Sequence, residues 1–133
     1  MKNTVVIVES DEGKIFGGYT PVSWDKTSLN KKDPSQQTFL FSITNNEKYP
    51  KIHDDHRAIY CNVHFGPAFG QGSDFYIGKE SNKQRKSNVV AFPTTFNNGN
   101  YTLSQEGTTA LCGSTNDNCF LTKQWEVYQI IWK

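Results

Sequence analysis

The chain has 133 residues, which suits a single domain over residues 1–133 that buries roughly two thirds of its unfolded surface. Its 14 Lys and Arg residues against 13 Asp and Glu residues give a formal net charge of +1, so no general field attracts nucleic acid or an anionic membrane. Aromatic side chains form 14% of a sequence rich in turn-forming residues, which is typical of a β-rich domain and argues against a helical bundle.

Two strands joined by a turn are the first predicted elements. Residues 4–8 are all β-branched and too few for a helix, and residues 10–13 supply the turn. Residues 14–19 are predicted to return as the partner strand. Gly17 and Gly18 would weaken an ordinary strand, so they indicate a bulge or a close approach by another backbone.

The clearest strand signal follows a polar segment, residues 25–37, which is predicted to be a surface loop. In residues 38–44 the side chains of Phe39, Phe41 and Ile43 share one face. This period-two alternation predicts a strand with its aromatic face over a core.

The middle of the chain alternates polar loops with short apolar runs. Residues 45–57 are polar and turn-rich, and strands are predicted at residues 58–63 and 74–77, on either side of a glycine turn (residues 66–72). Residues 78–88 are basic and lack an apolar stripe, which predicts a mobile loop.

The last third of the chain ends in a predicted strand with two usable faces, residues 125–132. Residues 104–118 are predicted to be a polar connection, and no helical period persists for about 10 residues anywhere. The pattern as a whole predicts a mostly β fold, a two-layer antiparallel β-sandwich with long polar loops and little helix.

Cys61, Cys112 and Cys119 cannot all pair within one chain, and no apolar signal region follows Met1. We therefore expect free thiols in a reducing cytoplasm, with a Cys112–Cys119 disulfide as the alternative. Cys61 is expected to be buried and inert, and the other two, in polar surroundings, are the better candidates for oxidation. No run approaches the roughly 18 apolar residues of a membrane span, so no membrane insertion is expected.

Three local features are candidate sites, and each has a simpler structural interpretation. The glycine turn could cradle a phosphate, but it lacks a nucleotide-loop ending, and Asp74 is expected to orient it through backbone hydrogen bonds. The cluster from His53 to His64 has metal-like residue types without zinc spacing, which favours a solvated loop. The basic loop is a candidate contact for an acidic protein surface through four side chains, Lys79, Lys83, Arg85 and Lys86.

A series of motifs in fixed order covers essentially the whole chain. They are Phe-Gly-Gly at residues 16–18 with Pro21 and Trp24, Phe-Leu-Phe-Ser-Ile at 39–43, Phe-Gly-Gln-Gly at 69–72, Thr-Phe-Asn-Asn at 95–98 and Glu-Val-Tyr at 126–128. Together they resemble the TLDc domain family, with Gln71 departing from the usual glycine. The resemblance implies structural roles for Phe16, Gly17, Gly18, Trp24, Phe39, Phe41, Phe69, Gly70, Gly72, Asp74, Phe96 and Glu126.

The resemblance implies a function without an enzymatic site. It brings no nucleophile, base or metal set, so we expect no catalytic residue, cofactor or metal. It implies a non-enzymatic protein-interaction domain with a role in oxidation resistance and in regulating the vacuolar proton-pumping ATPase through its peripheral sector.

One departure from the family leaves alternatives open. Members normally carry a short strand and helices before the strand that begins here at Thr4, so we expect either a short form or a partner that supplies the missing layer. A structural subunit of a larger assembly, whose partner completes the sheet, is therefore one alternative function. A redox enzyme is the other, using the thiols of Cys112 and Cys119 or a metal at the cluster from His53 to His64.

Overall fold

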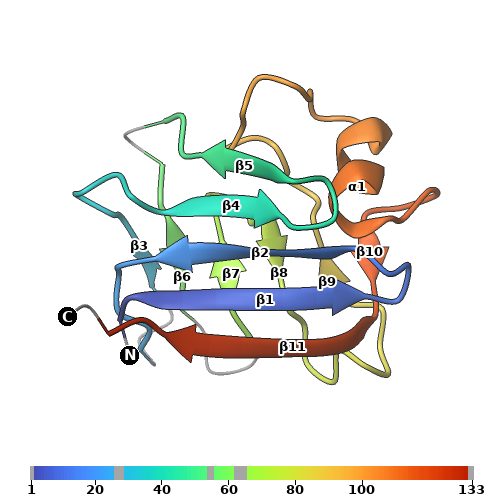
Figure 1. Cartoon of the computed structure of the whole chain (residues 1–133), viewed down its shortest axis with the longest axis horizontal. Coiled ribbons are helices and arrows are strands. Elements are labelled where there is room, and N and C mark those ends of the chain that lie inside the picture. The colour runs from blue at the N-terminus through green and yellow to red at the C-terminus, as the bar shows by residue number, and fades with distance from the viewer. Residues whose placement is uncertain (1, 26–28, 54–55, 62–65, 132–133) are drawn as a thin grey trace.

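The computed structural model describes residues 2–25, 29–53, 56–61 and 66–131. These residues form two antiparallel β-sheets packed face to face, as predicted, with a short helix beside them (Figure 1). In Figure 1 the strands of the sheet nearer the viewer run across those of the sheet behind it. We call the nearer sheet the front sheet and the other the back sheet.

The front sheet has five strands in the order β11-β1-β2-β4-β5. They are β1 (Thr4–Ser10), β2 (Ile15–Thr20), β4 (Phe39–Ser42), β5 (Glu47–Pro50) and β11 (Thr122–Gln129). The predicted hairpin and closing strand are confirmed, although residue 132 lies outside the described residues. The polar loop predicted over residues 45–57 is wrong at β5, because only Tyr49 of that strand is buried and one residue gives no alternation.

The back sheet has six strands of two residues each, in the order β10-β9-β8-β7-β6-β3. They are β3 (Asn30–Lys31), β6 (Ile59–Tyr60), β7 (Ala68–Phe69), β8 (Phe75–Tyr76), β9 (Ser87–Asn88) and β10 (Cys119–Phe120). β6 and β8 fall within predicted strands, of which residues 62 and 63 lie outside the described part. The others were missed because two residues are too few for a periodic signal, and β3 and β9 correct the loops predicted over residues 25–37 and 78–88.

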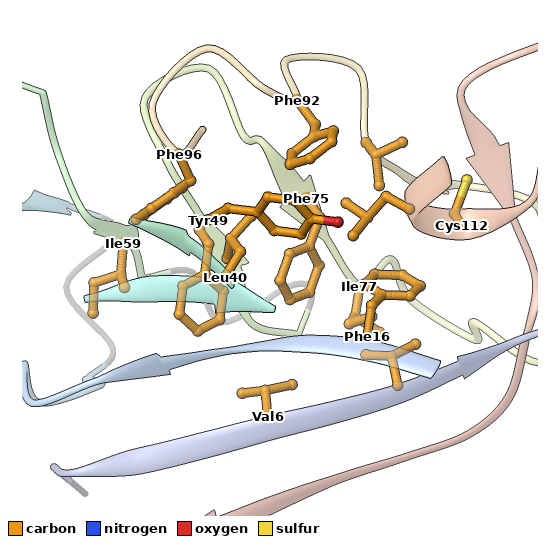
Figure 2. Packing of buried hydrophobic residues seen from close by; sticks show 14 of the residues in the cluster. Val6, Phe16, Leu40, Tyr49, Ile59, Phe75, Ile77, Phe92, Phe96 and Cys112 are labelled. Atoms are coloured by element: carbon orange, nitrogen blue, oxygen red, sulfur yellow. The ribbon is translucent and has the colours of Figure 1, made fainter. Parts of the chain in front are cut away.

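Aromatic side chains form much of the core between the two sheets. Phe16 of the front sheet meets Phe75 of the back sheet edge to face, with ring centroids 5.5 Å apart, and Phe75 stacks on Phe69 at 5.1 Å. Figure 2 shows side chains from both sheets and from the later loops converging in one cluster. Residues with no exposed surface there include Val6, Val8, Phe16, Leu40, Tyr49, Phe69, Phe75, Phe92, Phe96 and Phe120.

The two glycines in β2 allow two neighbouring groups to approach the strand very closely. A Cβ on Gly17 would lie 1.8 Å from the carbonyl oxygen of Val6, and one on Gly18 would lie 2.8 Å from the Phe69 ring. The register of β2 with β1 and β4 runs unbroken through the pair, so there is no bulge. Of the two predicted explanations, close approach is the one confirmed.

The prediction for β4 is right about the strand and wrong about its faces. Leu40 is buried and stands opposite Gly18, whose missing side chain would point at the back sheet. Phe39 and Phe41 are therefore half-buried on the outer face, and Ile43, just beyond β4, is 54% exposed. Since this strand is apolar on both sides, its alternation does not show which side meets the core.

A helix replaces the predicted polar connection over residues 104–118. α1 (Gln105–Cys112) ends at Gly113, whose N–H donates to the Thr109 carbonyl, a common helix stop. Leu111 and Cys112 are its buried residues at the end nearest the core. Eight residues make only about two turns, too few for an apolar stripe to appear in the sequence.

Candidate functional site

The glycine turn is joined to a distant segment by one buried carboxylate. Asp74 has no exposed surface and accepts hydrogen bonds from the backbone N–H groups of Thr95 at 2.9 Å and Phe96 at 3.1 Å. Gly70, with φ at +92°, leaves room for it, because a Cβ there would lie 2.3 Å from Asp74 Oδ1. Asp74 thus accepts backbone hydrogen bonds as predicted, but from residues 95 and 96 and not from the turn itself.

Burial disfavours the charged form of this carboxylate. It raises the pKa of Asp74 to about 7, and the hydrogen bonds from Phe96 and Thr95 oppose that rise only in part. The carboxyl group of Asp74 therefore titrates near neutral pH.

Thr95, the first residue of the Thr-Phe-Asn-Asn motif, is the centre of this connection, a role that the motif alone did not indicate. Its hydroxyl accepts a hydrogen bond from the Gln71 N–H at 3.0 Å and lies 3.1 Å from Nδ1 of His56. The side chain of Gln71, the residue that departs from the family glycine, accepts from the Arg57 N–H. The Gly70 N–H donates to the Ala58 carbonyl. These turn amides are already used, which favours a structural corner over a phosphate cradle.

The motif residues divide between the core, the turn and the outer surface. Phe16, Phe69 and Phe96 are core residues, whereas Gly70 and Gly72 adopt positive φ in the turn. The Trp24 side chain packs on the Phe69 ring and its Nε1 donates to Thr4 Oγ1 at 2.9 Å. Glu126 is exposed on β11, where its carboxylate accepts from the Tyr128 hydroxyl. Most of these residues therefore lie in the core or in the turn, and Glu126 lies on the outer surface.

The four basic-loop side chains predicted as a partner contact have different surroundings. Arg85 forms ion pairs with Asp117 at 2.9 Å and Asp11 at 3.3 Å, and donates to the Cys119 carbonyl at 2.7 Å. It therefore joins three segments of the fold. The side chains of the other three are exposed, and within the described residues they form no ion pair: Lys79, Lys83 and Lys86.

All three cysteines are free thiols, as expected. Cys61 is buried as predicted, but Cys112 is also buried, at the end of α1, which corrects the expectation of polar surroundings. Burial raises the pKa of Cys112 to about 11 and also raises that of Cys61, so both stay protonated at neutral pH. Cys119 is half-buried and the most accessible of the three.

The cluster from His53 to His64 is only partly described. The rings of His53 and His56 lie 4.3 Å apart, whereas Asp54, Asp55 and His64 lie outside the described residues. Among the residues that the structure describes, no three His, Cys, Asp or Glu side chains are placed to hold a metal ion. In the same part of the chain, no helix is long and apolar enough to cross a membrane.

The outer face of the front sheet, which points away from the back sheet, is a surface whose residues the sequence did not identify, although a missing layer was expected. It carries a groove of about 650 Å³ lined by Val5, Tyr19, Phe39, Phe41, Lys48 and Ile130. No helix or strand of the described residues lies in front of this face in Figure 1. The unbroken apolar run at residues 5–8 could have revealed it, because such a run is typical of a strand with apolar surroundings on both faces.

The comparisons with known proteins add one match. The protein-family model described as TLDc domain matches residues 1–131. A search of curated proteins found no match to the chain.

Proposed function

The chain belongs to the TLDc domain family, and from this premise we propose that it is a non-enzymatic protein-interaction domain that acts in oxidation resistance. TLDc domains are protein-interaction modules, and the match extends over nearly the whole chain. The coverage of residues 1–131 is the observation that carries the proposal.

The placement of the motif residues supports an interaction role. Asp74, Gly70 and Phe96 form buried contacts within the fold, and Gly17 and Gly18 allow close strand and ring packing. These residues specify the architecture, so recognition is left to exposed side chains. That division is usual for a binding module built on a rigid scaffold.

We further propose that the partner is the peripheral sector of the vacuolar proton-pumping ATPase, bound in the cytoplasm. The three exposed lysines of the basic loop, Lys79, Lys83 and Lys86, form the contact with an acidic surface. Arg85 holds the loop in place through Asp11 and Asp117. Free thiols fit a reducing compartment.

The test is direct binding between the purified chain and purified peripheral sector, measured by biolayer interferometry. We expect binding that weakens by on the order of tenfold when Lys83→Glu and Lys86→Glu are combined. The matched control reverses two exposed lysines elsewhere, Lys2→Glu and Lys32→Glu, which leaves net charge equal to that of the test variant. If the wild-type chain does not bind, the pump is not the partner. If the test variant and the control variant bind equally well, the basic loop does not form the contact.

A structural subunit is the second candidate, and the open edge of β11 favours it. Among the described residues, β1 is the one strand that pairs with β11, and Trp125, Val127 and Tyr128 are 37%, 38% and 49% exposed. The Ile130 N–H donates to the Asn3 carbonyl, so alternation turns the amides of Trp125 and Val127 toward the open side. A partner strand could complete the sheet there.

Val127→Pro tests this candidate because it removes an outward N–H without removing a bond to β1. If a partner strand pairs with β11, the variant should fold normally. When the tagged variant is purified from its source cells, the partner should no longer co-purify with it. Val127→Ala keeps the N–H and serves as the control. A complex that retains the proline variant would exclude this edge.

A further inference from the structure

Both faces of the front sheet are apolar, but the described chain covers only one of them. In β1 the inner side chains Val6 and Val8 are buried, while the outer side chains Val5 and Ile7 are half-buried. A sheet surface of this kind is stabilised by another layer packed against it. The question is which layer fits the outer face.

Two charged side chains on the outer face lie at opposite ends of one row, and a third, Glu9, lies in the adjacent row, where it forms an ion pair with Lys123. Strand pairing places five residues side by side across the sheet, in the order Glu126, Ile7, Gly17, Phe41 and Lys48. The next row is uncharged and consists of Tyr128, Val5, Tyr19, Phe39 and Pro50. The charged row thus has an acid on β11, a base on β5 and apolar residues between them.

Neither end of the charged row is neutralised within the described chain. The ammonium group of Lys48 lies over the Phe39 ring, 4.3 Å from its centroid, and the Glu126 carboxylate accepts from the Tyr128 hydroxyl. Both charged side chains are exposed. Each is therefore placed to meet an opposite charge on a facing surface.

We propose that the outer face of the front sheet is the interface of a symmetric dimer of this chain. The twofold axis lies between the two copies and runs parallel to β2, the middle strand. It therefore reverses the strand order in the facing copy. Glu126 then faces Lys48 of the other copy, and the reverse pair forms by symmetry. Between the two pairs Ile7 faces Phe41, with Gly17 at the axis.

The size of the face suits a weak, reversible dimer. The five strands lie about 4.8 Å apart and have four to eight residues each at roughly 3.3 Å per residue, which gives a face of roughly 450 Å². Two faces together come to about 900 Å², which is in the range of weak and transient interfaces. Face-to-face packing of aligned sheets brings the apolar rows into contact and leaves the charged ends at the rim.

Sedimentation equilibrium on the whole chain, across a concentration series, tests the proposal with charge reversals. Lys48→Glu or Glu126→Lys alone places like charges together at both ends of the interface. We expect each single variant to raise the dimer dissociation constant by on the order of tenfold. The double variant restores opposite charges, so it should dimerise as the wild type does.

Lys83→Glu and Glu80→Lys are the controls, because they make the same charge changes away from the front sheet and should leave dimerisation unchanged. Thermal melts followed by circular dichroism check that all variants fold. A wild-type chain that stays monomeric overturns the proposal. The proposal is also overturned if the single reversals leave the dimer dissociation constant unchanged. The same holds if the double variant dimerises as weakly as a single variant. None of these outcomes bears on pump binding through the basic loop.

Discussion

Gly70 and Asp74 compete for one space: a Cβ on Gly70 would lie 2.3 Å from Oδ1 of Asp74, which is far inside van der Waals contact. The carboxylate can reach the backbone of Thr95 and Phe96 only because residue 70 has no side chain. A glycine that the family resemblance marks as structural is thus explained by its partner as well as by its positive φ.

Gly70→Ala should destabilise the fold by about 2–4 kcal/mol, through strain at positive φ and the clash with Asp74. Gly99→Ala is the matched control, since its φ is +90° but nothing lies within 4 Å of the added Cβ. The control should lose only about 1 kcal/mol. Urea unfolding of both variants measures the difference, and equal losses would show that the clash is relieved at little cost.

Asp74 should make stability fall as pH rises from about 4 to about 7. Its ordinary pKa is 3.8 and burial raises the folded-state pKa to about 7. Between these values the folded carboxyl retains a proton that the unfolded chain has lost, so its contribution is full at low pH and is lost as pH passes the folded pKa. The shift corresponds to at most about 4 kcal/mol.

Asp74→Asn isolates this effect because it cannot titrate at that position. Unfolding free energies at about pH 5 and about pH 8 should show the wild type losing stability relative to the variant. Other carboxylates contribute equally to both proteins and cancel in the comparison. Parallel pH profiles would mean that the folded pKa of Asp74 is not raised.

Arg85 and Lys83 should differ in their effect on stability although they are two residues apart. Arg85→Gln breaks an exposed network to Asp117, Asp11 and the Cys119 carbonyl, and should cost about 1 kcal/mol. Lys83→Gln should change stability by less than about 0.5 kcal/mol. Chemical denaturation distinguishes them, and a neutral Arg85 variant would show that the network contributes little in solution.

Leu40 and Phe41 test which face of β4 meets the core. Leu40→Ala removes a side chain with no exposed surface and should cost about 2–5 kcal/mol. Phe41→Ser alters the half-buried outer face and should cost about 1 kcal/mol in dilute solution. Thermal melts at low protein concentration provide the comparison. A larger loss at Phe41 would reverse the assignment of the faces.

The three thiols should react in a fixed order with a thiol-specific reagent. Cys119 is half-buried and should react with the folded protein, whereas the buried Cys61 and Cys112 should react only when the chain opens. Counting modified sites by mass spectrometry, with and without denaturant, measures the order. Rapid modification of Cys112 in the native protein would contradict its burial.

The sequence was sufficient for the fold class because β1, β2, β4 and β11 have enough residues to show strand patterns. It was insufficient for the back sheet, whose strands are two residues long and are held by pairing with their neighbours. Phe39 and Phe41 show a different limit. Alternation identifies two faces of a strand, but the close fit of Gly18 against Phe69 decides which face is inside.

The candidate site was predictable where chemistry is local and not where it depends on distant contacts. Asp74 beside a glycine turn could be recognised as a backbone acceptor, but its donors at residues 95 and 96 are 21 and 22 positions away. Arg85 was grouped with its neighbouring lysines because their charges are alike. Its partner Asp11 lies 74 positions away, which no local pattern reveals.

The pairing of β1 with β11 makes the order of synthesis matter. Glu9 and Gln124 are bonded across 115 positions, and Ser10 pairs with Thr122. On a ribosome the apolar strand at the beginning of the chain therefore waits for nearly the whole sequence before its outer neighbour emerges. Contacts this distant slow folding, and until β11 is made the side of β1 opposite β2 lacks its partner strand. A chain truncated before β11 would leave that edge of β1 unpaired in the described sheet, with Val5 and Ile7 beside the open edge.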